Sequence, residues 1–186
     1  MNLGILGSSS TSLALDSYLT NSNAADLLAT KKDYTFIVGC ETGPMQNVVE
    51  LLEEKGCFME YVGLAGSKEL ENSSADVKIT ATSPINRTEI ITNESDALLF
   101  LSGGIGTRAE FYSALTTKLE LNTDKPLIIY NEDHSYDTLL KDMDQAIKQG
   151  SMTSSARLCF DVAMNTNELD TILKKYENKT TKEKSK

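Results

Sequence analysis

The chain of 186 residues contains little of what metal sites and disulfide frameworks need. His134 is the only histidine, which excludes metal sites built from several histidines. The three cysteines, Cys40, Cys57 and Cys159, are odd in number, widely spaced and free of any C-x-x-C pair. This pattern predicts neither a disulfide framework nor a zinc site. We therefore expect a protein that works without a metal and without a cofactor.

Long hydrophobic segments are also missing. The longest apolar run, Ala97–Leu101, is far shorter than the roughly 20 residues that a membrane-spanning helix requires. The first residues, Met1–Ser12, lack the basic segment and the apolar stretch of a secretory signal. The sequence thus predicts a soluble, cytoplasmic protein with no membrane partner.

Basic residues are outnumbered: 18 Lys and Arg stand against 27 Asp and Glu, for a formal net charge of -9. Such a surface repels phosphate polymers, so we expect no nucleic-acid partner. A small anionic ligand remains possible, because a local pocket can override the overall field. Hydrophobic residues make up 40% and charged residues 24%, which is typical of a globular domain with a sizeable core.

Short apolar runs alternate with amphipathic segments along the whole chain. The expected strands are Leu3–Leu6, Thr35–Val38, Phe58–Gly63, Ala97–Leu101, Pro126–Tyr130 and Leu158–Val162, with a further candidate at Val77–Ala81. The expected helices are Leu13–Leu28 (interrupted at Thr20–Asn23), Pro44–Lys55, Pro84–Glu94, Thr107–Leu121, Tyr136–Gln149 and Asn167–Tyr176. This order predicts one α/β domain over residues 1–176, a Rossmann-like, doubly wound parallel sheet with helices on both faces. Residues 177–186 read as a polar, flexible tail.

Ligands of such sheets bind where strands lead into helices, and one junction is the strongest candidate. It reads Ser102-Gly103-Gly104-Ile105-Gly106-Thr107 and joins the apolar strand to a helix. The glycines leave backbone N–H groups uncovered, and the helix N-terminus adds positive potential. In chemical terms this is a phosphate site. It is neither a Walker loop nor the spaced dinucleotide fingerprint.

Glu110 and Arg87 are the candidate catalytic side chains. Thr107 and Glu110 form a T-x-x-E pattern, which on its own slightly favours a capping box over a role in chemistry. The alternative is a carboxylate that faces the sugar of a bound nucleotide, where it would stabilise the positive charge of glycosidic cleavage. Taken alone, Arg87 is typical of a solvent-exposed helix residue. Its position just before the glycine-rich unit is the reason to consider it as a site residue.

Two further junctions are weaker. The first strand ends at Gly7-Ser8-Ser9, which could contact a ligand or form an ordinary tight turn. The second junction runs over 39–45, from Gly39 to Met45, and contains Gly43. Glu41 within it argues against a phosphate there and could instead accept hydrogen bonds from sugar hydroxyls.

These residues resemble the LONELY GUY family, known from old annotation as lysine-decarboxylase-like proteins. The stretch from Gly103 to Glu110 matches the family's G-G-x-G-T-x-x-E core, and Ser102 stands where the family has proline. Arg87 and Asp96 fall on the spacing of its upstream arginine and aspartate. The similarity covers about Leu3 to Tyr176.

The resemblance implies hydrolysis of the N-glycosidic bond of a purine nucleoside 5'-monophosphate, of adenine or cytokinin type, to the free base and ribose 5-phosphate. It implies a homo-oligomer, dimeric or larger. Its site residues would be Arg87 and Glu110 for catalysis, with substrate contacts from Gly7, Ser8, Ser9, Gly39, Gly43, Met45, Ser102, Gly103, Gly104, Gly106 and Thr107.

Several departures from the family pattern leave the substrate open. Thr88 replaces the lysine beside the arginine, Cys40 and Glu41 replace two glycines, and Gln46 replaces another. Molybdenum-cofactor carrier proteins share the same core and bind without hydrolysis, so a binding or carrier protein is the alternative. The sequence argues against a pyridoxal-dependent decarboxylase, because no lysine stands in a recognisable Schiff-base context.

Overall fold

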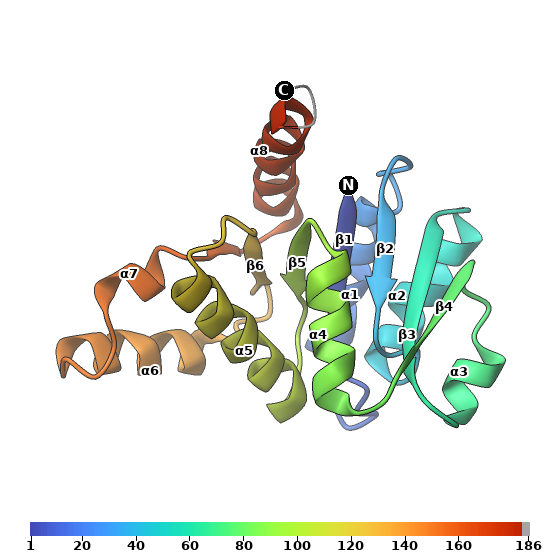
Figure 1. Cartoon of the computed structure of the whole chain (residues 1–186), viewed down its shortest axis with the longest axis horizontal. Helices are drawn as coiled ribbons and strands as arrows, with labels where there is room; N and C mark the ends of the chain where they lie inside the picture. The colour runs from blue at the N-terminus through green and yellow to red at the C-terminus, as the bar shows by residue number, and fades with distance from the viewer. Residues whose placement is uncertain (184–186) are drawn as a thin grey trace.

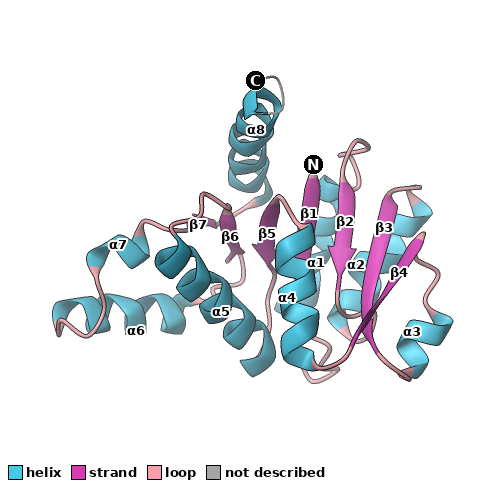
Figure 2. Ribbon diagram, in the orientation of Figure 1, coloured by secondary structure: helices cyan, strands magenta, loops and turns pink. Residues whose placement is uncertain are grey.

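The computed structural model describes residues 1–183 and contains one sheet of seven parallel strands (Figures 1 and 2). The strands are β1 (Asn2–Leu6), β2 (Thr35–Val38), β3 (Phe58–Leu64), β4 (Val77–Ala81), β5 (Ala97–Phe100), β6 (Leu127–Tyr130) and β7 (Asp161–Ala163). Their spatial order is β4-β3-β2-β1-β5-β6-β7, and every pair is parallel. The order reverses between β1 and β5, which is where parallel sheets open a crevice for ligands. The predicted α/β fold is confirmed.

Helices cover both faces of this sheet. They are α1 (Leu15–Leu28), α2 (Pro44–Glu54), α3 (Lys68–Asn72), α4 (Pro84–Glu94), α5 (Ile105–Leu121), α6 (Asp137–Lys148), α7 (Ser154–Arg157) and α8 (Thr166–Glu183). In Figure 1, α4 and α5 lie in front of the sheet, whereas α1 and α2 lie behind it.

Alternate residues of the interior strand β5 belong to two separate cores, one on each face of the sheet. Leu99 packs in one cluster with side chains of α1, α2 and α8. Leu98 and Phe100 pack in the other with side chains of α4, α5 and α6. All three are fully buried, as expected for a strand that is covered on both faces.

The polar stretch Thr20–Asn23 does not interrupt α1, contrary to our prediction. Thr20 and Asn21 are buried, and Asn21 Oδ1 accepts a hydrogen bond from the Ser102 backbone N–H at 3.2 Å. The helix therefore places polar side chains inward because they face the polar end of β5, and the sequence cannot show that partner.

Near the C-terminus the predicted boundaries are partly wrong. The expected strand Leu158–Val162 begins later, as β7 at Asp161, and the short helix α7 precedes it. The helix α8 continues through Glu183, so the predicted tail 177–186 is helical in its first part and otherwise lies outside the described residues. Among the described residues, no helix combines the length and the apolar character needed to cross a membrane.

Candidate active site

A cavity of about 560 Å³ opens at the carboxyl ends of β1, β2, β3 and β5. These strand ends form the lower edge of the sheet in Figure 1. It therefore lies next to the point where the strand order reverses. Most of the predicted site residues line it: Gly7, Ser8, Ser9, Gly39, Arg87, Gly104, Gly106, Thr107 and Glu110. Segments that are far apart in the sequence thus meet at one site.

The N-terminus of α5 forms one end of the cavity. The helix begins at Ile105, with Gly104 as its N-cap residue. The first N–H groups of an α-helix have no partner within the helix, so those of Ile105, Gly106 and Thr107 are free to bind an anion. No atom lies within 4 Å of a Cβ built on Gly104 or Gly106, so this end has open space for a ligand. Such a site suits a phosphate group.

Glu110 lies one turn further along α5, and its side chain lines the same cavity. Because the helix begins at Ile105, Thr107 is a residue of its first turn and not its N-cap, so the capping-box interpretation of Thr107 and Glu110 is wrong. Burial raises the pKa of Glu110, whereas the Arg87 charge and a long hydrogen bond from Thr88 Oγ1, at 3.4 Å, lower it in part. The net result is a carboxylate of raised pKa beside the N-terminus of α5.

Arg87 is held over the end of β2 by close packing. A Cβ on Gly39 would stand 3.3 Å from Arg87 Cδ and 2.7 Å from Ile91 Cδ1, so a glycine at this position leaves room for the arginine. Arg87 Nε is buried and has no hydrogen-bond partner among the described residues. A buried donor without a partner is costly, which makes it a natural contact for an acceptor on a bound ligand.

Four predicted binding residues do not line the cavity. Met45 is fully buried, and its sulfur would be 2.5 Å from a Cβ on Gly7. Gly43 has a φ of +60° and packs against the Ser9 carbonyl. These contacts fix the shape of the first loop.

Ser102 and Gly103 are the other two. A Cβ on Gly103 would collide with Thr107 Oγ1 at 2.2 Å, so the turn into α5 needs a glycine there. The side chain of Ser102 points to Asp133 and donates a hydrogen bond to its Oδ2 at 2.7 Å.

Asp133 is a residue that our sequence analysis missed. Its carboxylate also accepts hydrogen bonds from Ser17 Oγ at 2.5 Å and from the Ser135 backbone N–H at 3.1 Å. Burial alone would raise the pKa of Asp133, but the hydrogen bonds from these three serines outweigh it and lower the pKa. Asp133 thus ties α1 and the loop after β6 to the residue that opens the glycine-rich turn. Its position after a strand was the only signal in the sequence.

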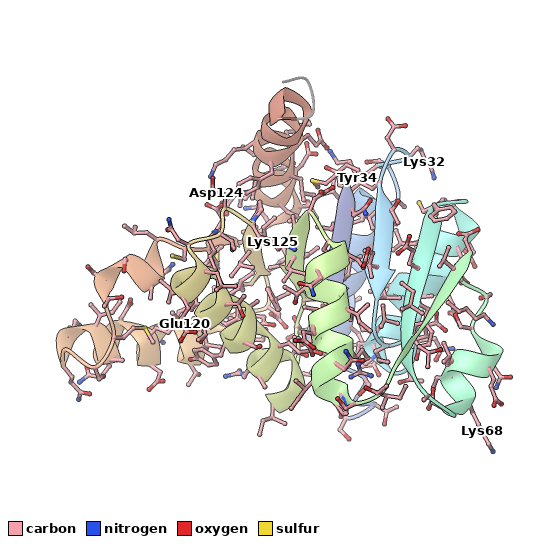
Figure 3. The ribbon with its side chains drawn as sticks, in the orientation of Figure 1. Lys32, Tyr34, Lys68, Glu120, Asp124 and Lys125 are labelled. Atoms are coloured by element: carbon pink, nitrogen blue, oxygen red, sulfur yellow. The ribbon has the colours of Figure 1, made fainter. Side chains whose placement is uncertain are left out.

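No lysine is found among the described residues that line the cavity. Burial lowers the pKa of Lys125, as Schiff-base chemistry would require, but Lys125 precedes β6 at the opposite, amino end of the sheet (Figure 3). Lys32 lies at that end too, whereas Lys68 is near the lower edge but outside the cavity. Within the described part of the chain, Arg87 is the one cationic side chain at the cavity wall, which favours anion binding over lysine-based chemistry.

A family model described as possible lysine decarboxylase matches residues 44–173. A cytokinin riboside 5'-monophosphate phosphoribohydrolase from Arabidopsis thaliana is 32% identical over 110 residues, which are 59% of this chain and 51% of that protein. A probable enzyme of the same name from Oryza sativa subsp. japonica is 34% identical over 86 residues, 46% of this chain and 41% of that protein. The chain thus spans about half the length of these relatives.

Solved structures resemble the chain over most of its length. The molybdenum cofactor carrier protein of Chlamydomonas reinhardtii has a TM-score of 0.63 at 18% identity, covering 95% of this chain and 98% of its own. The molybdenum cofactor binding protein of Rippkaea orientalis has a TM-score of 0.67 at 17% identity, covering 94% and 95%. At these identities the resemblance establishes a common fold.

Proposed function

Since the chain belongs to the lysine-decarboxylase-like family that includes the LONELY GUY enzymes, we propose that it hydrolyses the N-glycosidic bond of a purine nucleoside 5'-monophosphate. The products are the free base and ribose 5-phosphate. The observation that carries the proposal is the convergence of Glu110, Arg87 and the N-terminus of α5 on one cavity. An anion site, a carboxylate and a cation are the groups that this reaction needs.

Each group has a distinct part in the reaction. The N–H groups of Ile105, Gly106 and Thr107 bind the 5'-phosphate and fix the nucleotide in the cavity. As the bond between the ribose C1' and the base nitrogen breaks, positive charge builds on C1' and the ring oxygen. The Glu110 carboxylate stabilises that charge and orients the attacking water. Arg87 donates a hydrogen bond to the departing base, which takes up a proton while the water's hydroxyl goes to C1'.

A binding protein without turnover is the second candidate, and one contact favours it. Thr88 stands where the resemblance implies a lysine, and its hydroxyl approaches Glu110 Oε1. A hydroxyl supplies less positive charge beside Glu110 than a lysine would. In that case the same cavity would bind a nucleotide or a nucleotide-like cofactor and release it unchanged.

Base release from nucleoside 5'-monophosphates tests the proposal. We expect AMP or another purine monophosphate to yield its base and ribose 5-phosphate, detected by chromatography over hours. The unphosphorylated nucleoside should bind at least about tenfold more weakly, because charge-assisted phosphate contacts are lost. Tight binding without any base release would support the carrier, and equal affinity for nucleoside and nucleotide would refute the phosphate site.

We also propose, from the family resemblance, that the chain forms a homo-oligomer. Light scattering of the purified protein gives its mass directly, and the monomer mass of 20.4 kDa at micromolar concentration would contradict the proposal.

A further inference from the structure

Glu41 is a carboxylate in the same cavity that the proposed reaction does not use. It follows β2, two strands away from β5, and its side chain lines the cavity wall together with Tyr61 and Leu64 of β3. The family resemblance implies a glycine at this position. A charged side chain in place of a glycine gives this chain a feature of its own.

Ser73 holds Glu41 in place. The Ser73 hydroxyl donates a hydrogen bond to Glu41 Oε1 at 2.6 Å and accepts one from the Ala75 backbone N–H at 3.2 Å. Because an ionised carboxylate can only accept, the proton of this buried hydroxyl points to Glu41. Among the described residues, no hydrogen bond reaches Glu41 Oε2. This oxygen is therefore fixed, acceptor-only when ionised, and free.

The order of the strands places Glu41 beyond the sugar of a bound nucleotide. The cavity runs across the ends of β5, β1, β2 and β3, and neighbouring strands are about 4.8 Å apart. With the phosphate at α5, which follows β5, the end of β2 is about 10 Å away. Arg87 lies over the end of β2 at Gly39, before Glu41. The ribose hydroxyls are only a few bonds from the phosphate, so the group that reaches Glu41 is the base.

We propose that Glu41 is a specificity-determining residue that selects bases with an exocyclic amino group. The inference rests on the proposed function, because it assumes that the phosphate binds at α5. An amino group donates N–H bonds to the free carboxylate oxygen, whereas a carbonyl at the same ring position places two acceptors against each other. Tyr61 and Leu64 supply a largely apolar wall for the ring. Burial also raises the pKa of Glu41, because it disfavours the charged carboxylate, and the hydrogen bond from Ser73 offsets this only in part. An amino group of the base supplies a further donor.

The test compares binding of three nucleotides that differ at one ring position. AMP carries an amino group, purine riboside 5'-monophosphate carries hydrogen, and IMP carries a carbonyl. Binding is measured by calorimetry in the Glu110→Gln background, so that no ligand is consumed and the result does not depend on turnover. The same set is measured after adding Glu41→Gln, whose amide can donate to a carbonyl.

Glu53→Gln is the matched control. Glu53 accepts a hydrogen bond from Ser74 Oγ at 2.7 Å, as Glu41 does from Ser73, but it does not line the cavity. Both variants remove one negative charge from neighbouring Ser–Glu pairs. Only the variant in the cavity removes the proposed base contact.

We expect AMP to bind about tenfold or more tightly than either analogue, because a site built to bond an N–H group rejects ligands that lack it. Glu41→Gln should bring IMP to within a few-fold of AMP, and Glu53→Gln should leave the ratio unchanged. Equal binding of all three nucleotides to the parent overturns the role of Glu41 and leaves the proposed function intact. If 2'-deoxy-AMP binds more weakly than AMP, and if Glu41→Gln removes this difference in affinity, Glu41 contacts the sugar and not the base, and the proposal is overturned. If no nucleotide binds, both proposals fall.

Discussion

Replacing Glu110 by glutamine separates chemistry from binding in the proposed reaction. Glutamine keeps the shape of the side chain and removes its charge. The phosphate site uses backbone N–H groups at the start of α5 and not the Glu110 side chain, so the nucleotide should still bind. A charge positioned at the developing cation is worth about 3 kcal/mol, so we expect turnover to fall by about a hundredfold or more.

The stability of the protein should change little in this variant. Glu110 does not cap α5, because the helix begins at Ile105. Among the described residues its one side-chain hydrogen bond comes from Thr88 Oγ1 and is long, at 3.4 Å. The loss of attraction to Arg87 and the relief of carboxylate burial oppose each other. We expect the free energy of unfolding to stay within about 1 kcal/mol of the parent, as is usual when no core contact is lost.

Turnover is measured by single-turnover release of the base, nucleotide binding by calorimetry, and the free energy of unfolding by urea titration. Glu120→Gln is the control: Glu120 lies on the same helix, exposed and outside the cavity (Figure 3). The parent should also lose activity on acidification at a pH above the usual range for glutamate, because the raised pKa protonates Glu110 early. Normal turnover in Glu110→Gln, with binding intact, would refute the catalytic assignment.

Two further changes probe the frame around the site. Gly103→Ala places a methyl group against Thr107 and should lower the free energy of unfolding by about 1–3 kcal/mol. Gly106→Ala is the control, because its methyl group meets open space, and it should not lower that free energy. Urea titration compares the two variants, and equal stability would show that the turn can relax. Asp133→Asn should lower the free energy of unfolding by about 1 kcal/mol at neutral pH, a figure that allows for the partial exposure of Asp133. The folded pKa of Asp133 is lowered, so its contribution is present above the unfolded value of about 3.9 and disappears as the pH falls through the folded value. Parent and variant should therefore converge in stability below about pH 4, and a constant difference down to pH 2 would contradict the lowered pKa.

The layered fold could be predicted because a short, unbroken apolar run between amphipathic segments indicates a buried strand. The unbroken run at Ala97–Leu101 indicates a strand that is buried on both faces, and the structure places it inside the sheet, between β1 and β6. Polar segments are ambiguous when read alone. Thr20–Asn23 looks like a break in a helix, yet Asn21 bonds the backbone at the end of β5, and that partner is 81 positions away.

The sequence predicted most of the residues of the site, but it did not predict the structural role of each one. Glycines at 103, 104 and 106 look alike in the sequence, but Gly103 makes room for Thr107, whereas Gly104 and Gly106 leave space for a ligand. The T-x-x-E pattern suggested a cap because it fits the local rule, and the actual start of α5 depends on how the turn leaves β5. Asp133 gave no signal beyond its position after a strand, since its partners Ser17 and Ser102 come from distant segments.

The two ends of the cavity have opposite electrostatic character, and this limits the ligands that fit it. The start of α5 offers unpaired N–H groups and positive potential, whereas the end near β2 and β3 carries Glu41 and Glu69. A second phosphate at the far end would face these carboxylates. A ligand with one anionic group and a neutral, donor-bearing ring fits both ends at once, and its scissile bond then lies between them, where Glu110 and Arg87 meet. The net negative charge of the chain is compatible with such a ligand, because in the proposed site the anion is bound by a local helix end and not by net charge.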